Sequence, residues 1–233
     1  MEKVYRNTSL LFIVILVVIL WGFYRTYFGL FPNFNGISNV QHIHGILFLI
    51  WFGFLIVQPL LIRYNKPVLH RKIGSLSYVI VPILLLSIFL VSKEQYHRMA
   101  TIIPKEQNLG GMALNIPDIF AFAALYILAM INKKNTAYHM RYMIATSLLL
   151  IGPGAGRAFI IYGGMPFPQG VLFAIILSEV LAAVFLLTDI ANRKPFQPYL
   201  VTLLIFIGLH LCWHFQMSAW WQIFAGTFAN VFF

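Results

Sequence analysis

Histidines are the residues of this 233-residue chain whose type and spacing could do chemistry, because six of the seven lie in or beside long apolar runs. His44 lies at the start of one run, and His70 and His139 each open another. His210 and His214 are four residues apart, a spacing that places both on one face of a helix. Imidazole binds haem iron and other metals, and a polar ring in apolar surroundings is costly unless it has a partner. These five histidines are therefore candidate site residues.

His42 and His44 are two residues apart, so a helix turns them toward nearly opposite faces. His44, Trp51 and Gln58 recur at an interval of seven residues and form one stripe with polar groups at both ends. The stripe predicts that His44 faces the interior and that His42 is an interfacial residue. A simpler interpretation, in which His44 only bonds a loop carbonyl, stays open.

Arg157 is a candidate because it lies within an apolar run, 18 residues or five helical turns after His139 and on the same face. A cation at this depth needs an anion. Glu179 lies in the middle of a later run and is the preferred partner. Asp118 follows Asn115-Ile116-Pro117, which is typical of a helix start, so it is interpreted as a first-turn acid. Whether an Arg157–Glu179 pair is structural or functional stays open.

The composition indicates a membrane protein, since 61% of the residues are hydrophobic and only 9% are charged. Soluble domains carry about a quarter charged residues. The apolar runs are about 20 residues long without alternation, as expected for membrane-spanning helices. The net charge of +10 sits in short loops, so we expect a lipid bilayer as partner and no nucleic acid. The single Cys212 excludes an internal disulfide framework and a multi-cysteine metal site.

The predicted fold is all-α, a polytopic membrane helix bundle of seven transmembrane helices that forms a single transmembrane domain over residues 1–233. The first run lacks a small-residue cleavage site and continues into aromatic residues, so it is interpreted as a retained helix rather than a signal peptide. The predicted spans are roughly 10–30, 42–62, 72–92, 117–132, 139–162, 170–190 and 199–219.

Lysine and arginine are distributed unevenly between the two sides of these spans, which predicts a cytoplasmic N-terminus and an outside C-terminus. The membrane itself is expected to be a bacterial inner membrane. Eleven fall on the inner side: Lys3, Arg6, Arg63, Lys66, Arg71, Lys72, Lys133, Lys134, Arg141, Arg193 and Lys194. Four fall on the outer side: Arg25, Lys93, Arg98 and Lys105.

Three further segments carry expectations. Residues 92–116 are predicted to form an outer loop, and the uncharged tail 218–233, rich in Trp and Phe, to lie partly in the outer interface. Asp189 lies near the inner boundary and is expected to meet Arg193.

The candidate histidines fall at two depths, which suggests a redox protein. Bis-histidine haem needs one histidine from each of two facing helices, small residues where the ring enters and cations near the propionates. The inner set comprises His70, His139, Gly74, Arg71 and Arg141, and the outer set comprises His44, His210 or His214, Gly45 and Arg157. Two haem b groups at these depths would carry electrons across the bilayer to a redox partner.

This arrangement resembles that of the di-haem cytochrome b561-type membrane proteins, although that family places its ligands on a compact four-helix core. Here the ligands fall on the second, third, fifth and seventh predicted helices. The start His70-Arg71-Lys72-Ile73-Gly74, and His139 followed by Met143 and Arg157, also resemble a group of bacterial multi-span proteins without a settled activity. The resemblance implies the architecture more than the function.

A zinc enzyme is the alternative. His44, His210 and His214 would form a three-histidine site with an open position for water, and Glu179 or Asp118 would act as base on a small lipid-soluble substrate. This pattern is similar to the seven-helix family of alkaline ceramidases and adiponectin-receptor-type proteins. That family has a serine four residues before its first histidine, where this chain has Val40. A transporter or receptor without cofactor is the third alternative, since no nucleotide-binding motif or nucleophile elbow is present.

Overall fold

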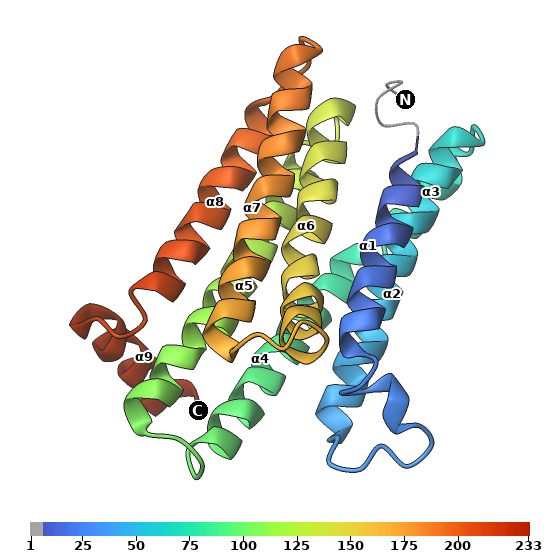
Figure 1. Cartoon of the computed structure of the whole chain (residues 1–233). Coiled ribbons are helices and arrows are strands. Elements are labelled where there is room, and N and C mark those ends of the chain that lie inside the picture. Colours follow the sequence, from blue (N-terminus) through green and yellow to red (C-terminus); the bar gives the residue numbers. More distant parts are fainter. Residues whose placement is uncertain (1–6) are drawn as a thin grey trace.

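The computed structural model describes residues 7–233, and every regular element in that part of the chain is a helix (Figure 1). Lys3 and Arg6, which entered the charge count, lie outside the described residues. The elements are α1 (Thr8–Phe23), the 3₁₀ turn η2 (Phe28–Leu30), α2 (Asn39–Arg63), α3 (Pro67–Gly74), α4 (Ser77–Met99), α5 (Lys105–Ile131), α6 (Thr136–Ile161), α7 (Phe167–Ala191), α8 (Gln197–His214) and α9 (Ala219–Phe232).

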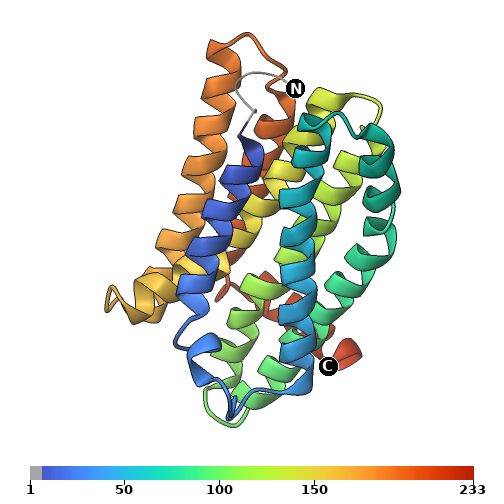
Figure 2. The ribbon, with the colours of Figure 1, turned by 90° about the vertical axis from the view of Figure 1, so that its right-hand side faces the viewer.

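The all-α class is confirmed, and six helices are long and apolar enough to cross a membrane. They are α2, α3 together with α4, α5, α6, α7 and α8. The first predicted span, residues 10–30, is shorter than expected, because α1 has 16 residues and reaches about 24 Å at 1.5 Å per residue. That length is less than the roughly 30 Å of a bilayer core. α1 nevertheless packs along α2 and α6 (Figure 2).

The predicted outer loop over residues 92–116 is wrong, because α4 continues to Met99 and α5 begins at Lys105. The polar residues of this segment continue two helices rather than forming a loop. The Asn108 side chain donates to the carbonyl of Tyr96 at 3.0 Å and ties the two extensions together. Pro117 therefore lies inside α5, where membrane bundles tolerate proline. Asp118 is not a first-turn acid.

The chain turns sharply after α8, which ends at His214, several residues before the predicted boundary. α9 then lies across the end of the bundle (Figure 1). It buries Trp221, whose Nε1–H donates to the carbonyl of Leu109 at 3.0 Å, and exposes Trp220 and Ile223. One buried and one exposed apolar face suit a helix at the bilayer surface, as predicted for the tail.

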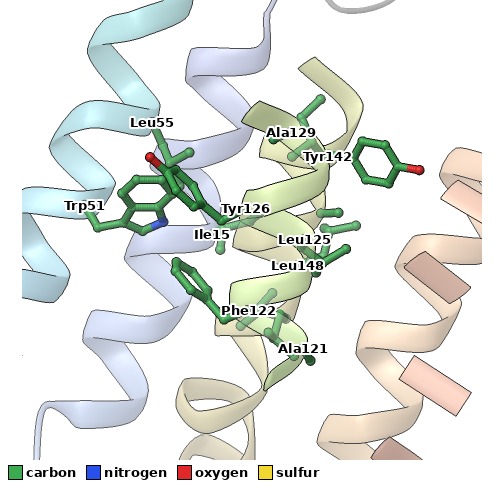
Figure 3. Close-up of a cluster of buried hydrophobic side chains, with 14 of the residues drawn as sticks. Ile15, Trp51, Leu55, Ala121, Phe122, Leu125, Tyr126, Ala129, Tyr142 and Leu148 are labelled. Carbon is green, nitrogen blue, oxygen red and sulfur yellow. The ribbon is translucent and has the colours of Figure 1, made fainter. Parts of the chain in front are cut away.

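α6 is the central helix, with α1, α5, α7 and α8 packed around it. At its crossing with α1, a Cβ on Gly22 would lie 2.0 Å from the carbonyl oxygen of Gly154, so both backbones need glycine there. Beside α6, the ring of Trp51 on α2 meets Phe122 and Tyr126 of α5 at centroid distances of 5.6 and 5.9 Å (Figure 3).

The two ends of the bundle differ in charge. We call the end at which α1 begins the basic end, and the opposite one the α9 end (Figure 1). The helix ends and turns of the basic end carry Arg63, Lys66, Arg71, Lys72, Lys133, Lys134, Arg193 and Lys194.

Candidate functional site

His70 of α3 and His139 of α6 come together at the basic end, as the inner set predicts. Their ring centroids are 6.5 Å apart and the ring planes are nearly perpendicular, at 88°. The Nδ1 atom of His139 lies 2.8 Å from the carbonyl oxygen of Ala129 on α5. A carbonyl only accepts, so this nitrogen carries the proton. In the neutral ring the Nε2 atom of His139 therefore presents a lone pair.

Gln58 of α2 contacts His70 and is the site residue whose role sequence reasoning missed. With its nitrogen toward the ring, the Gln58 amide donates to the Nδ1 atom and to the carbonyl of His70, and its oxygen accepts from the N–H of Gly74 at 3.3 Å. His70 then carries its proton on Nε2. Turned by half a rotation, the same amide would accept from an Nδ1–H and leave Nε2 with a lone pair. The stripe of His44, Trp51 and Gln58 predicts that Gln58 faces the interior of the bundle, and this was the sequence signal that could have identified it.

Arg141, which the inner set included, is unavailable to the histidine pair. Its side chain is fully buried and donates to both carboxylate oxygens of Asp189, at 2.6 and 2.9 Å, and to the carbonyl of Ala137 at 2.9 Å. The predicted Asp189–Arg193 contact is therefore replaced by Arg141–Asp189, and Arg193 is exposed. Arg71 is exposed.

His44 faces the interior, as the stripe predicts, and bonds a side chain rather than a loop carbonyl. Its Nδ1 atom lies 3.0 Å from the hydroxyl oxygen of Ser87 on α4. The Ser87 hydroxyl donates its own proton to the carbonyl of Leu84 at 2.6 Å, so it accepts from His44. His42 points toward the loop after α1 and lies 2.6 Å from the hydroxyl of Tyr27.

His210 pairs with Glu179, which joins α8 to α7 through an Nδ1–Oε1 distance of 3.0 Å. His214 is exposed and lies against Phe215. His44 belongs to α2, which lies on the opposite side of the bundle from α8 (Figures 1 and 2). The structure therefore does not bring the outer histidines together.

The proposed zinc ligands are likewise separate. Among residues 7–233, no group of three or more His, Cys, Asp or Glu side chains is placed to hold a metal ion. The zinc site therefore stays a prediction that rests on the spacing of His210 and His214.

Arg157 pairs with neither predicted carboxylate. Within the described chain no carboxylate oxygen lies within 4.0 Å of its guanidinium. One Nη1–H donates to the carbonyl of Pro153 at 3.0 Å, and the guanidinium carbon lies 4.1 Å from the ring centroid of Phe23. The predicted Arg157–Glu179 pair is thus wrong, because Glu179 turns to His210 and an aromatic face takes its place beside the cation.

Arg157 and Asp118 instead line a cavity of about 320 Å³ between α5, α6, α7 and α8, with Gln95 of α4 at its edge. The polar residues of its wall are Gln95, Asn115, Asp118, Arg157 and Ser178. This cavity has no counterpart among the predicted sites, since Arg157 was assigned to haem propionates and Asp118 to a helix start or to a zinc site.

These features define the class of the protein as an all-α, multi-pass membrane protein. Comparison of the chain with known protein families, characterised proteins and solved structures gives no match. The resemblance to cytochrome b561-type proteins and to the bacterial multi-span group stays a prediction based on the motifs quoted above.

Proposed function

We propose that this protein is a multi-pass protein of the bacterial inner membrane that binds haem b between His70 and His139 and takes part in electron transfer. The observation that carries the proposal is the separation of the two rings. Metal–imidazole bonds of about 2.0–2.1 Å on opposite sides of one ion put ring centroids roughly 6 Å apart. The measured separation is 6.5 Å.

The surroundings of the two rings suit ligation. Histidines that bind metals almost always donate their other ring N–H to an oxygen, and the Ala129 carbonyl already holds His139 in that tautomer. Gln58 would accept the Nδ1–H of His70 with its amide oxygen toward the ring, and in that orientation it gives up its bonds to the His70 carbonyl and the Gly74 N–H. α3 has no buried residue, so a flat ring entering beside His70 displaces no core side chain of that helix. Bound haem b supplies one-electron redox chemistry there.

The charge asymmetry supports the orientation of the site. Cytoplasmic loops of membrane proteins are rich in lysine and arginine, and the cations of the described chain gather at the basic end. The His70–His139 pair lies at that end, so its redox partner is expected on the cytoplasmic side. Electron transfer to the far side would need a second cofactor, for which the outer histidines are not brought together.

We expect purified protein supplied with haem to show a Soret band, and His70→Leu and His139→Leu to abolish it, since each removes one axial ligand. Gln58→Leu is expected to weaken haem affinity by about 10–100-fold, the usual effect of losing the group that orients a ligand. Gln58→Glu keeps an acceptor for Nδ1–H and is expected to retain binding. Absorption titration with haem measures all four variants.

The matched control is His97→Leu, because His97 is exposed at the α9 end and contacts the Phe233 carbonyl. Its Soret band is expected to equal that of the wild type. A wild-type protein without a Soret band, or equal haem affinity in His70→Leu and His97→Leu, would overturn the haem proposal.

The zinc alternative is favoured by one observation, the Glu179–His210 pair, since a carboxylate that orients a histidine accompanies many zinc ligands. This alternative expects about one zinc ion per chain, lost in His210→Ala. Metal analysis of the purified protein decides it, and a chain without bound zinc excludes it. Its substrate would be a small lipid-soluble molecule.

A further inference from the structure

The cavity between α5, α6, α7 and α8 has the size and the walls of a small-molecule site. Its volume of about 320 Å³ lies at the lower end of the roughly 300–1,000 Å³ typical of ligand pockets. It extends from the α9 end, at Phe167 on the first turn of α7, to Leu149 and Phe206 deeper in the bundle. The apolar wall includes Leu149, Ile160, Val171, Ile175, Phe206 and Leu209.

Two groups that carry opposite charge when ionised lie on this wall without joining each other. Asp118 of α5 makes no hydrogen bond or ion pair to any residue of the described chain. Arg157 of α6 uses one N–H on the Pro153 carbonyl and one face on the Phe23 ring. A guanidinium has five N–H donors, so most remain available.

The other polar groups of the wall are uncharged, and Ser178 and Asn115 each bond to a neighbouring residue. The Ser178 hydroxyl donates to the carbonyl of Ala174 at 3.3 Å, and the Asn115 amide donates to Gln95 at 3.4 Å. Asp118 and Arg157 are the two ionisable groups of this wall, and a bound molecule would provide each of them with a hydrogen-bonding partner.

An ionisable side chain at membrane depth is costly, and those that face a cavity mark ligand or ion pathways. A carboxyl and a guanidinium that stay more than 4.0 Å apart leave both without a charged partner. A molecule that carries both charges would pair with Asp118 and with Arg157 at once, and its apolar part would contact the apolar wall of the cavity. We propose that this cavity binds a small zwitterion, with its anionic group on Arg157 and its primary ammonium on Asp118.

This chemistry has two sources. One is a free zwitterion of the size of an apolar amino acid. The other is the headgroup of phosphatidylethanolamine, which joins a phosphate to a primary ammonium by a short linker. Both present an anion and an N–H donor a few bonds apart, and the experiment separates them. The cavity shares no residue with the His70–His139 pair, so the test of this proposal is independent of the test of the haem proposal.

Thermal unfolding of the full chain in detergent tests the free source, with leucine as probe. Two analogues isolate the charges: 4-methylpentanoate lacks the ammonium, and 3-methylbutylamine lacks the carboxylate. We expect leucine to raise the unfolding midpoint at a concentration at least tenfold lower than either analogue needs. Unfolding in bilayer nanodiscs tests the lipid source. There, phosphatidylethanolamine is expected to raise the midpoint above that in phosphatidylcholine, whose ammonium carries no N–H.

A response in the leucine arm assigns a free ligand, and a response in the lipid arm assigns a headgroup. In either arm, Asp118→Asn and Arg157→Gln are expected to remove the shift. Glu94→Gln and Arg98→Gln, which lie outside the cavity, are expected to keep it. No shift in either arm, or a shift that survives in both cavity variants, would overturn the proposal. If the variants fail to fold, the two wild-type comparisons, leucine with its two analogues and phosphatidylethanolamine with phosphatidylcholine, still decide it.

Discussion

Replacing Arg141 with leucine is expected to lower the free energy of unfolding by about 3–5 kcal/mol, because it leaves the Asp189 carboxylate buried without its cation. The two side chains are 0% and 1% exposed, and hydrogen bonds of 2.6 and 2.9 Å join them between α6 and α7. Solvent screens such a pair little, so its loss is not offset by water. Equilibrium unfolding of the purified protein in mixed micelles measures the change.

The control for this variant is Arg63→Leu, since Arg63 is exposed at the same end of the bundle. Its effect is expected to stay within about 0.5 kcal/mol, as for most surface substitutions. The double variant Arg141→Leu/Asp189→Leu removes both charges and is expected to recover much of the loss. Equal unfolding free energies for Arg141→Leu and Arg63→Leu would show that the ion pair does not stabilise the fold.

Gly22→Ala is expected to destabilise the protein by about 3 kcal/mol, at the upper end of the range for overpacked cores. The added Cβ would lie 2.0 Å from the carbonyl oxygen of Gly154, and a backbone cannot give way as a flexible side chain can. Gly154→Ala faces the same limit, with its Cβ 2.6 Å from the Cα of Ile19. We therefore expect α1 to separate from α6 in both variants. Unfolding measurements and the rate of proteolysis after α1 report the change.

Gly53→Ala is the matched control, because a Cβ at Gly53 on α2 meets nothing within 4 Å. Alanine favours a helix over glycine by about 1 kcal/mol, so this variant is expected to be as stable as the wild type or more so. If Gly22→Ala matched Gly53→Ala, the close approach of α1 and α6 would not be required for stability.

The elements that could be predicted from the sequence are those with a strong local pattern. α2, α6 and α7 follow long apolar runs and appear within a few residues of their predicted bounds. The ends of α4 and α5 could not be predicted in this way, because both helices continue through polar residues. Asn108 supports that continuation through a contact with a neighbouring helix rather than through its own surroundings in the chain.

The sequence by itself determined the all-α membrane class, through its apolar runs, and the inward direction of His44, through the seven-residue stripe. Both are properties of single helices, because the periodicity of a helix depends on residues that are close together in the chain. Only the tertiary structure decided the partners. It joined Glu179 to His210 and Arg141 to Asp189, and it placed Asp118, the expected first-turn acid, in the wall of the cavity. These contacts join side chains from different helices, and which side chains meet depends on how all the helices pack around α6.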